Sequence, residues 1–286
     1  MARSGPQRIG LDVGGTSIKV GVYSSGGRQL RTERIPTSSW KGSFLESLER
    51  YVAEAAAPGA DVGVALPGIL SRDRSSAIFV EVLPELDGIN LAEFCRKALP
   101  NHEVHFANDA ECAALGLRAE SPALGDDFLY LGLGTGLASA MILDGRPFLG
   151  SCGNALELGY APQSDGGHLE GHIGVQGLLT AFAKTGQHIV PADISSALHA
   201  GTPAAETVRE EIRTRLVPVL AQAVLTLDVR TIAIGGGNSP TDSTFFEMLT
   251  GEVRAAIPYG YYSDLVVRRV EASPFVAARG AAMLGA

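Results

Sequence analysis

A pattern of two apolar strands joined by a glycine turn occurs twice in this chain. In the first copy, residues 9–22, apolar side chains alternate with other residues on both sides of a Gly-Gly turn. The second copy, residues 128–143, has a Gly-Thr-Gly turn. Alternation with a period of two around a glycine turn is typical of a β-hairpin. Two such hairpins, far apart in the chain, predict two similar halves.

The turns carry groups that suit the binding of phosphate. Asp12 comes just before the first turn, where a carboxylate can hold a hydrated metal ion. Glycines let backbone N–H groups approach an anion closely, and Thr16 adds a hydroxyl. A lone glycine hairpin is more often a plain turn, so this interpretation depends on its recurrence. A third glycine cluster, Gly235–Gly237, follows an apolar strand and precedes a helix with Asn238 or Ser239 as its expected cap.

The composition of the chain predicts a globular protein. Its 286 residues suffice for two domains, and 45% hydrophobic against 19% charged residues indicate a substantial core. The net charge of −8 disfavours a nucleic-acid partner. The sequence has no apolar stretch of membrane-spanning length and no signal-peptide pattern at its start. The three scattered cysteines are expected to be reduced thiols of a cytoplasmic protein.

Expected strands and helices alternate along both halves, which indicates an α/β fold. The pattern is interrupted near Ser121-Pro122, where the boundary between two domains is expected. The first domain then covers residues 1–118 and is completed by a closing helix within 274–286, and the second covers 119–273. The expected helices are 44–57, 91–99, 108–117, 178–184, 194–198, 205–227 and 274–284, and further strands are expected at 29–35, 61–66, 104–106 and 231–234.

Six short motifs follow one another along the chain, at residues 11–16, 66–68, 108–115, 132–136, 156–159 and 235–237. Together they resemble the motifs of the ROK family (repressors, open reading frames, kinases) of bacterial sugar kinases. The resemblance covers nearly the whole chain. It implies the two-lobed, actin-like ATPase fold of hexokinase, in which duplicated ribonuclease H-like domains close over ATP and a hexose. The repressor branch carries an N-terminal DNA-binding domain, whereas the phosphate hairpin starts at residue 9 here, which favours a kinase.

The resemblance assigns a hexose site. Asp109 matches the aspartate that contacts the sugar hydroxyl and takes its proton, and an ordinary carboxylate suffices because phosphoryl transfer mainly needs an oriented nucleophile. Glu157 matches a carboxylate that accepts hydrogen bonds from adjacent sugar hydroxyls. If the resemblance is set aside, Asn108 or Asp109 is expected simply to cap the following helix, and Glu157 to be a surface loop residue. Further sugar contacts are expected from Asn108, with Pro67 and Gly68 as a wall of the pocket.

The resemblance also assigns a site for ATP and Mg²⁺. Asp12 would hold Mg²⁺ through water, and the hydroxyls of Thr16 and Thr135 would meet phosphates. Lys19 could assist with the phosphate charge or be a solvent-facing strand residue. The backbone amides of Gly14, Gly15, Gly134 and Gly136 would bind phosphate, and Gly235, Gly236 and Gly237 would let the nucleoside lie against the backbone.

The chain departs from the family in the loop that binds zinc in many members. Tyr160 replaces a histidine, and the glycine-rich loop after it contains no cysteine. Because thiolates give such sites their affinity, no zinc is expected. His168 and His172, with Glu170 between them, leave a site of nitrogen and oxygen ligands open, although ordinary loop histidines are favoured. Tyr160 and Glu170 are expected to contact the sugar, but a gap-free alignment puts Gly174 in place of Glu170.

Together these features predict a kinase that uses ATP and Mg²⁺ to phosphorylate the primary hydroxyl of a hexose, with glucose as the first candidate. One alternative is a sugar-binding regulator that has lost catalysis, and another is a kinase for an N-acetylated hexosamine. The zinc-free loop also resembles that of polyphosphate-using glucokinases, which makes polyphosphate an alternative donor. The expected partner is a small-molecule sugar, without nucleic acid or membrane, and a homodimer is carried over from the family.

Overall fold

The computed structural model describes residues 7–285, which form two compact units. The sequence predicts that the chain crosses from the first domain to the second near residue 118 and returns to the first near residue 274. The segment 146–155, expected in the second domain, groups with the first unit instead. Of the described residues, the first unit contains 7–122, 146–155 and 272–285, and the second contains 123–145 and 156–271.

The sheet of the first unit contains, in spatial order, β3 (Gln29–Pro36), β2 (Ser17–Ser24), β1 (Gln7–Val13), β4 (Asp61–Leu66) and β7 (Glu103–Asn108). The strand β1 pairs antiparallel with β2 and parallel with β4, and β4 pairs parallel with β7. The first hairpin of the sequence is therefore β1 and β2, whose apolar residues lie in the core. A separate small hairpin consists of β5 (Ile69–Leu70) and β6 (Ala77–Phe79).

The sheet of the second unit contains, in spatial order, β9 (Leu137–Leu143), β8 (Phe128–Leu133), β11 (Thr231–Gly235) and β12 (Val266–Arg269). The strand β8 pairs antiparallel with β9 and parallel with β11, and β11 pairs parallel with β12. This succession repeats that of β2, β1, β4 and β7, so the prediction of two similar α/β halves is confirmed. The two-residue strand β10 (Arg146–Pro147) follows β9 along the chain.

Helices fill the connections between the strands. The helix α4 was not expected from the sequence, and the closing helix α9 is shorter than expected. The first unit contains α1 (Phe44–Ala55), α2 (Leu91–Ala98), α3 (Asp109–Glu120) and α9 (Val276–Ala281). The second contains α4 (Leu169–Ile173), α5 (Val175–Lys184), α6 (Ile194–His199), α7 (Pro203–Leu227) and α8 (Ser243–Ala256).

The start of α8 differs from its prediction. Its cap is Asp242, whose side chain accepts a hydrogen bond from the backbone N–H of Thr244 at 2.9 Å. The prediction that Asn238 or Ser239 caps this helix is therefore wrong. The reason is that the glycine cluster is followed by a longer loop, in which Asn238 has another role described below.

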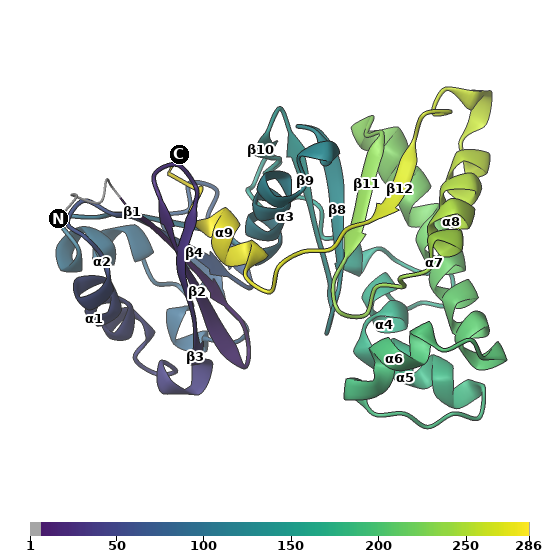
Figure 1. Cartoon of the computed structure of the whole chain (residues 1–286), viewed down its shortest axis with the longest axis horizontal. Coiled ribbons are helices and arrows are strands. Elements are labelled where there is room, and N and C mark those ends of the chain that lie inside the picture. Colours follow the sequence, from purple (N-terminus) through teal and green to yellow (C-terminus); the bar gives the residue numbers. More distant parts are fainter. Residues whose placement is uncertain (1–6, 286) are drawn as a thin grey trace. The chain divides into compact units, whose positions relative to one another are not determined.

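The closing helix α9 lies against the first sheet and against α3 (Figure 1). Two glycines of the sheet allow this approach. A Cβ at Gly10 of β1 would collide with the carbonyl oxygen of Ala278 in α9. A Cβ at Gly63 of β4, the register partner of Gly10, would collide with the carbonyl oxygen of Ala281. Glycine within a strand is unfavourable unless another backbone must come close, as it does here.

Two more glycines bring α9 and α3 together. A Cβ at Gly116 of α3 would collide with the carbonyl oxygen of Val276. A Cβ at Gly280 of α9 would collide with the carbonyl oxygen of Cys112. Because backbone atoms cannot move aside as a flexible side chain can, these two helices require glycine at both points.

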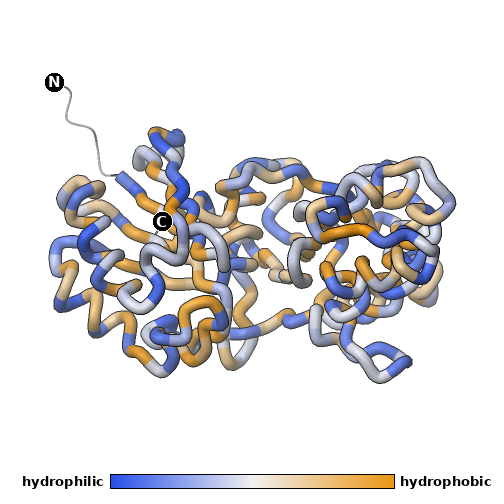
Figure 2. The backbone as a smooth tube through the Cα atoms, turned by 90° about the horizontal axis from the view of Figure 1, so that it is seen from below, coloured by the Kyte–Doolittle hydropathy of each residue, from blue (hydrophilic) through white to orange (hydrophobic). Residues whose placement is uncertain are grey.

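Among the described residues, no helix is both long and apolar enough to cross a membrane. Figure 2 shows the apolar residues of both units as short stretches interrupted by polar ones. Each unit has its own core, formed mainly by the apolar faces of its sheet and helices.

We expect Gly280→Ala to lower the free energy of unfolding of the first unit by at least about 2 kcal/mol, because the new methyl group overpacks a backbone contact. The matched control is Gly251→Ala in α8, where a Cβ meets no atom within 4 Å. That change should be neutral or stabilise by up to ~1 kcal/mol, because alanine favours a helix. Denaturant unfolding measures both, and equal effects would contradict the packing argument.

Candidate functional site

The motif that carries Asp109 lies where β7 ends and α3 begins. The Asn108 side chain caps the helix, since its Oδ1 accepts a hydrogen bond from the backbone N–H of Ala110 at 2.8 Å. Oδ1 of Asp109 accepts from the same N–H at 2.9 Å. The other end of the Asn108 amide donates to the carbonyl oxygen of Gly68 at 3.1 Å. The capping role is thus mainly that of Asn108, which also ties the helix start to the Pro67-Gly68 turn.

Gly68 occupies a backbone conformation that favours glycine. Its φ is +145°, and a Cβ there would collide with the carbonyl oxygen of Phe79. The turn therefore needs glycine for two reasons, and it points its carbonyl oxygen at Asn108. This explains in physical terms why Gly follows Pro67 at the expected wall of the hexose site.

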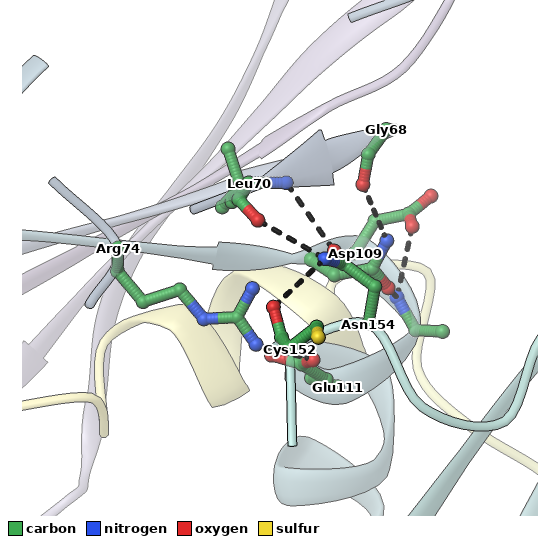
Figure 3. Close-up of polar contacts among 9 residues, drawn as sticks. Gly68, Leu70, Arg74, Asp109, Glu111, Cys152 and Asn154 are labelled. Atoms are coloured by element: carbon green, nitrogen blue, oxygen red, sulfur yellow. Dashed lines mark hydrogen bonds and ion pairs between the residues drawn. The ribbon is translucent and has the colours of Figure 1, made fainter. Parts of the chain in front are cut away.

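The side chain of Asn154 fastens the hairpin that follows this turn. Its Oδ1 accepts from the backbone N–H of Leu70 at 3.3 Å, and its Nδ2 donates to the Leu70 carbonyl oxygen at 3.1 Å (Figure 3). Its Nδ2 also lies 3.2 Å from the carbonyl oxygen of Cys152. The amide acts as an added peptide group on the edge of β5. Sequence reasoning missed Asn154, because no local pattern relates it to Leu70.

A second residue that sequence reasoning missed is Arg74, in the loop between β5 and β6. Its Nη2 lies 2.7 Å from Oε1 of Glu111, two residues after Asp109 on α3 (Figure 3). Glu111 is only 8% exposed. Burial raises the pKa of Glu111 to about 7, although the positive charge of Arg74 acts in the opposite direction.

The first glycine turn joins β1 to β2, and its tip is exposed. Asp12 is buried, with 8% of the residue exposed, and its Oδ2 lies 2.8 Å from Nζ of Lys19, its register partner on β2. The carbonyl oxygen of Gly14 accepts a hydrogen bond from the hydroxyl of Thr37 at 2.6 Å. The backbone at Gly15 and Thr16 is exposed. The hairpin thus presents a carboxylate beside an open turn, with Lys19 facing that carboxylate.

The second glycine turn and the third glycine cluster lie next to each other. The Nδ2 of Asn238 donates to the carbonyl oxygen of Gly134 at 2.8 Å, and its backbone N–H donates to the carbonyl oxygen of Leu133 at 3.0 Å. Gly236 has a φ of +95°, and a Cβ there would collide with the same Leu133 oxygen. Asn238 therefore joins the turn at Gly134–Gly136 to the cluster at 235–237.

Glu170, on α4, supports the second turn. Its Oε2 accepts a hydrogen bond from the backbone N–H of Leu137 at 2.7 Å, and a Cβ at Gly136 would collide with this oxygen. Glu157 is exposed as a residue, but its carboxylate is partly desolvated. This desolvation, together with the negative charge of Glu170, raises the pKa of Glu157 above its ordinary value. Tyr160 is 66% exposed and meets the ring of His168 edge-on, with 5.9 Å between ring centroids.

An ion-pair network holds the glycine-rich loop that follows Tyr160. Asp165 lies 2.9 Å from Nη2 of Arg215 on α7 and 3.1 Å from Nε2 of His172 on α4. In the part of the chain that the structure describes, no group of three or more His, Cys, Asp or Glu could hold a metal ion. The absence of zinc from the protein itself stays a prediction.

The sequence profile of the ROK family matches residues 8–286. The chain belongs to the ROK family. The solved structure of a ROK hexokinase from Thermus thermophilus superposes with a TM-score of 0.79 at 25% identity, over 97% of both chains. The predicted family and the predicted actin-like ATPase fold are therefore confirmed.

Two relatives with assigned activities cover most of the chain. An N-acetyl-D-glucosamine kinase of Aliivibrio salmonicida is 28% identical, over 91% of this chain and 92% of its own. A kanosamine kinase of Amycolatopsis mediterranei is 27% identical, over 88% of this chain and 90% of its own.

The raised pKa of Glu111 predicts how stability depends on pH. Its folded pKa of about 7 lies above the ordinary value of 4.5, so the folded state binds this proton more tightly than the unfolded state. Stability contributed by this group is then present at low pH and is lost as the pH rises from about 4.5 to about 7. Relative to Glu111→Gln, the wild type should lose up to about 3 kcal/mol over this range.

Urea unfolding of both proteins at pH 5 and pH 8 measures this difference. Subtracting the free energy of unfolding of the Gln variant at each pH cancels the titration of other groups, because both proteins share them. A stability difference that stays constant between the two pH values would contradict the raised pKa.

Proposed function

We propose that this ROK protein transfers the γ-phosphoryl group of ATP to the primary hydroxyl of a hexose, with glucose as the first candidate. The coarser class, a sugar kinase, is confirmed by the family and by both relatives. The observation that supports the proposal most is the junction of β7 and α3. There Asn108 caps the helix and holds the Gly68 turn, and Asp109 occupies the first helical position.

In this proposal Asp109 orients the acceptor hydroxyl and takes its proton. Transfer of a phosphoryl group through a loose transition state depends on alignment of the attacking oxygen more than on the strength of the base. A carboxylate on the first turn of a helix is well suited, because its backbone is held by the helix and by the capped strand end. Asn108, Pro67 and Gly68 are proposed to form the adjoining wall for the sugar.

Glu157 is proposed to accept hydrogen bonds from neighbouring sugar hydroxyls. Tyr160 is exposed and close to His168, so its hydroxyl is available to a ligand. Glu170 already accepts a hydrogen bond from Leu137 through one oxygen, and we propose that its other oxygen faces the sugar.

ATP and Mg²⁺ are proposed as donor and cofactor. A hydrated Mg²⁺ is commonly held by one or two carboxylates together with substrate phosphates. Asp12 is the carboxylate next to the exposed first turn, and its Oδ2 lies 2.8 Å from Nζ of Lys19. Asp12 would supply that carboxylate, and Mg²⁺ would neutralise phosphate charge during transfer. The hydroxyls of Thr16 and Thr135 and the amides of both glycine turns would hold phosphate. The nucleoside would lie against Gly235, Gly236 and Gly237.

An N-acetylated hexosamine is the second candidate substrate. The relative from Aliivibrio salmonicida is a kinase of N-acetyl-D-glucosamine, so an acetamido group is within the range of this part of the family. The two candidates differ only at one sugar carbon, and the choice between them is proposed to depend on the side chains around Tyr160.

Coupled measurement of ADP release tests the reaction. We expect a signal with at least one of glucose, mannose, fructose, N-acetylglucosamine and N-acetylmannosamine, and a loss of ~10²–10⁴-fold in kcat for Asp109→Asn. Asp87→Asn, in the same unit but outside the proposed site, serves as a variant of the same type. If Asp109→Asn retained the turnover of the wild type, Asp109 would not be the base. Glucose binding by calorimetry without ADP formation would favour the regulator.

A second variant tests the sugar contact. Glu157→Gln should raise KM for the hexose about tenfold, because a charged hydrogen-bond acceptor is lost, and should leave KM for ATP unchanged. Glu247→Gln on α8 is the matched change elsewhere in the second unit. A rise in KM for ATP instead of the hexose would move Glu157 out of the sugar site.

A further inference from the structure

Arg74 combines three features that each cost folding free energy. It has a φ of +59°, a left-handed conformation that is unfavourable for residues other than glycine. Its Nη1 is buried, with no hydrogen-bond partner among the described residues. Its ion pair with Glu111 is largely buried, and such pairs seldom stabilise a fold more than apolar residues would. Costs of this kind gather at functional sites.

The loop that carries Arg74 is itself well held. Oδ1 of Asp73 accepts hydrogen bonds from the hydroxyls of Ser71 and Ser75, at 2.7 and 2.8 Å. The backbone N–H of Arg74 donates to the carbonyl oxygen of Ser71 at 2.8 Å. The backbone of this loop is thus held in place, so the ion pair of Arg74 with Glu111 links a fixed loop, and the hairpin of β5 and β6, to α3.

This hairpin is attached to the first turn of α3 at two places. At its start, Gly68 accepts the hydrogen bond from Asn108, at the cap of the helix. At its tip, Arg74 reaches Glu111, on the same first turn. Asp109 lies between Asn108 and Glu111 in the sequence, so the two attachments are on either side of the proposed base along the chain.

We propose that the Arg74–Glu111 ion pair is a positioning element of the acceptor site, which sets the spacing between the Pro67-Gly68 wall and Asp109. The inference rests on the proposed hexose kinase activity. A guanidinium is planar and directional, so its pairing fixes an orientation as well as a distance. Displacement of a reacting group by about 1 Å can cost ~10²-fold in rate. The folding free energy that is lost at Arg74 would then be the consequence of keeping a fixed geometry at the acceptor site.

Steady-state kinetics of Arg74→Met, with the best hexose and with ATP varied in turn, test this role. We expect kcat/KM for the hexose to fall about 10- to 100-fold, because the wall is no longer aligned with Asp109, and KM for ATP to stay unchanged. Arg72→Met is the matched control, since Arg72 is exposed in the same loop. It should retain wild-type values. Unchanged hexose kinetics in Arg74→Met would overturn the proposal.

The double variant Arg74→Met/Glu111→Leu separates positioning from stability. Replacing both charges by apolar groups should restore thermal stability, whereas the single change leaves a buried carboxylate unpaired. We expect the double variant to fold well and still to show the 10- to 100-fold loss in kcat/KM for the hexose. A stable double variant with wild-type hexose kinetics would overturn the proposal, even if Arg74→Met does not fold. Wild-type protein without hexose-dependent ADP release would overturn the proposed function instead.

Discussion

The first unit depends on the backbone contact of α9 with α3 and with the strands β1 and β4. Glycine at each contact point removes the Cβ atom that would otherwise separate the two backbones. This contact fixes the place of α3 on its sheet, and α3 carries Asp109 on its first turn. A side chain at the start of a helix moves with that helix. The placement of the proposed base is therefore decided in part by glycines whose role is to let backbone segments come close together.

The two units share a strand succession but use it differently. In the first, the end of β7 leads into the helix with Asn108 and Asp109. In the second, the end of β11 leads into the glycine cluster that Asn238 ties to the neighbouring turn. Ligands of open α/β sheets commonly bind at the carboxyl ends of parallel strands. Under the proposed function, the end of β7 would serve the acceptor sugar, and the end of β11 would serve the nucleoside.

Local patterns in the sequence predict most of the fold. The second hairpin, expected over 128–143, appears as β8 and β9, because alternation and a glycine turn act within a few residues. Contacts between distant segments were not predictable. Arg74 meets Glu111 only after the hairpin folds back, and Asn154 meets Leu70 only because residues 146–155 belong to the first unit. The roles of Gly10 and Gly63 were not predictable either, because a glycine within a strand does not identify the segment that packs against it.

The position of α9 near the end of the chain also affects the order in which the two units can fold during synthesis. During synthesis a domain usually folds once its own residues have left the ribosome. Here the residues of the second unit emerge before α9, and the first sheet and α3 must wait for that helix to complete their packing. The unit whose strands are translated first is then the last to reach its final core. Until translation reaches α9, the faces of β1, β4 and α3 that this helix covers in the folded protein remain exposed.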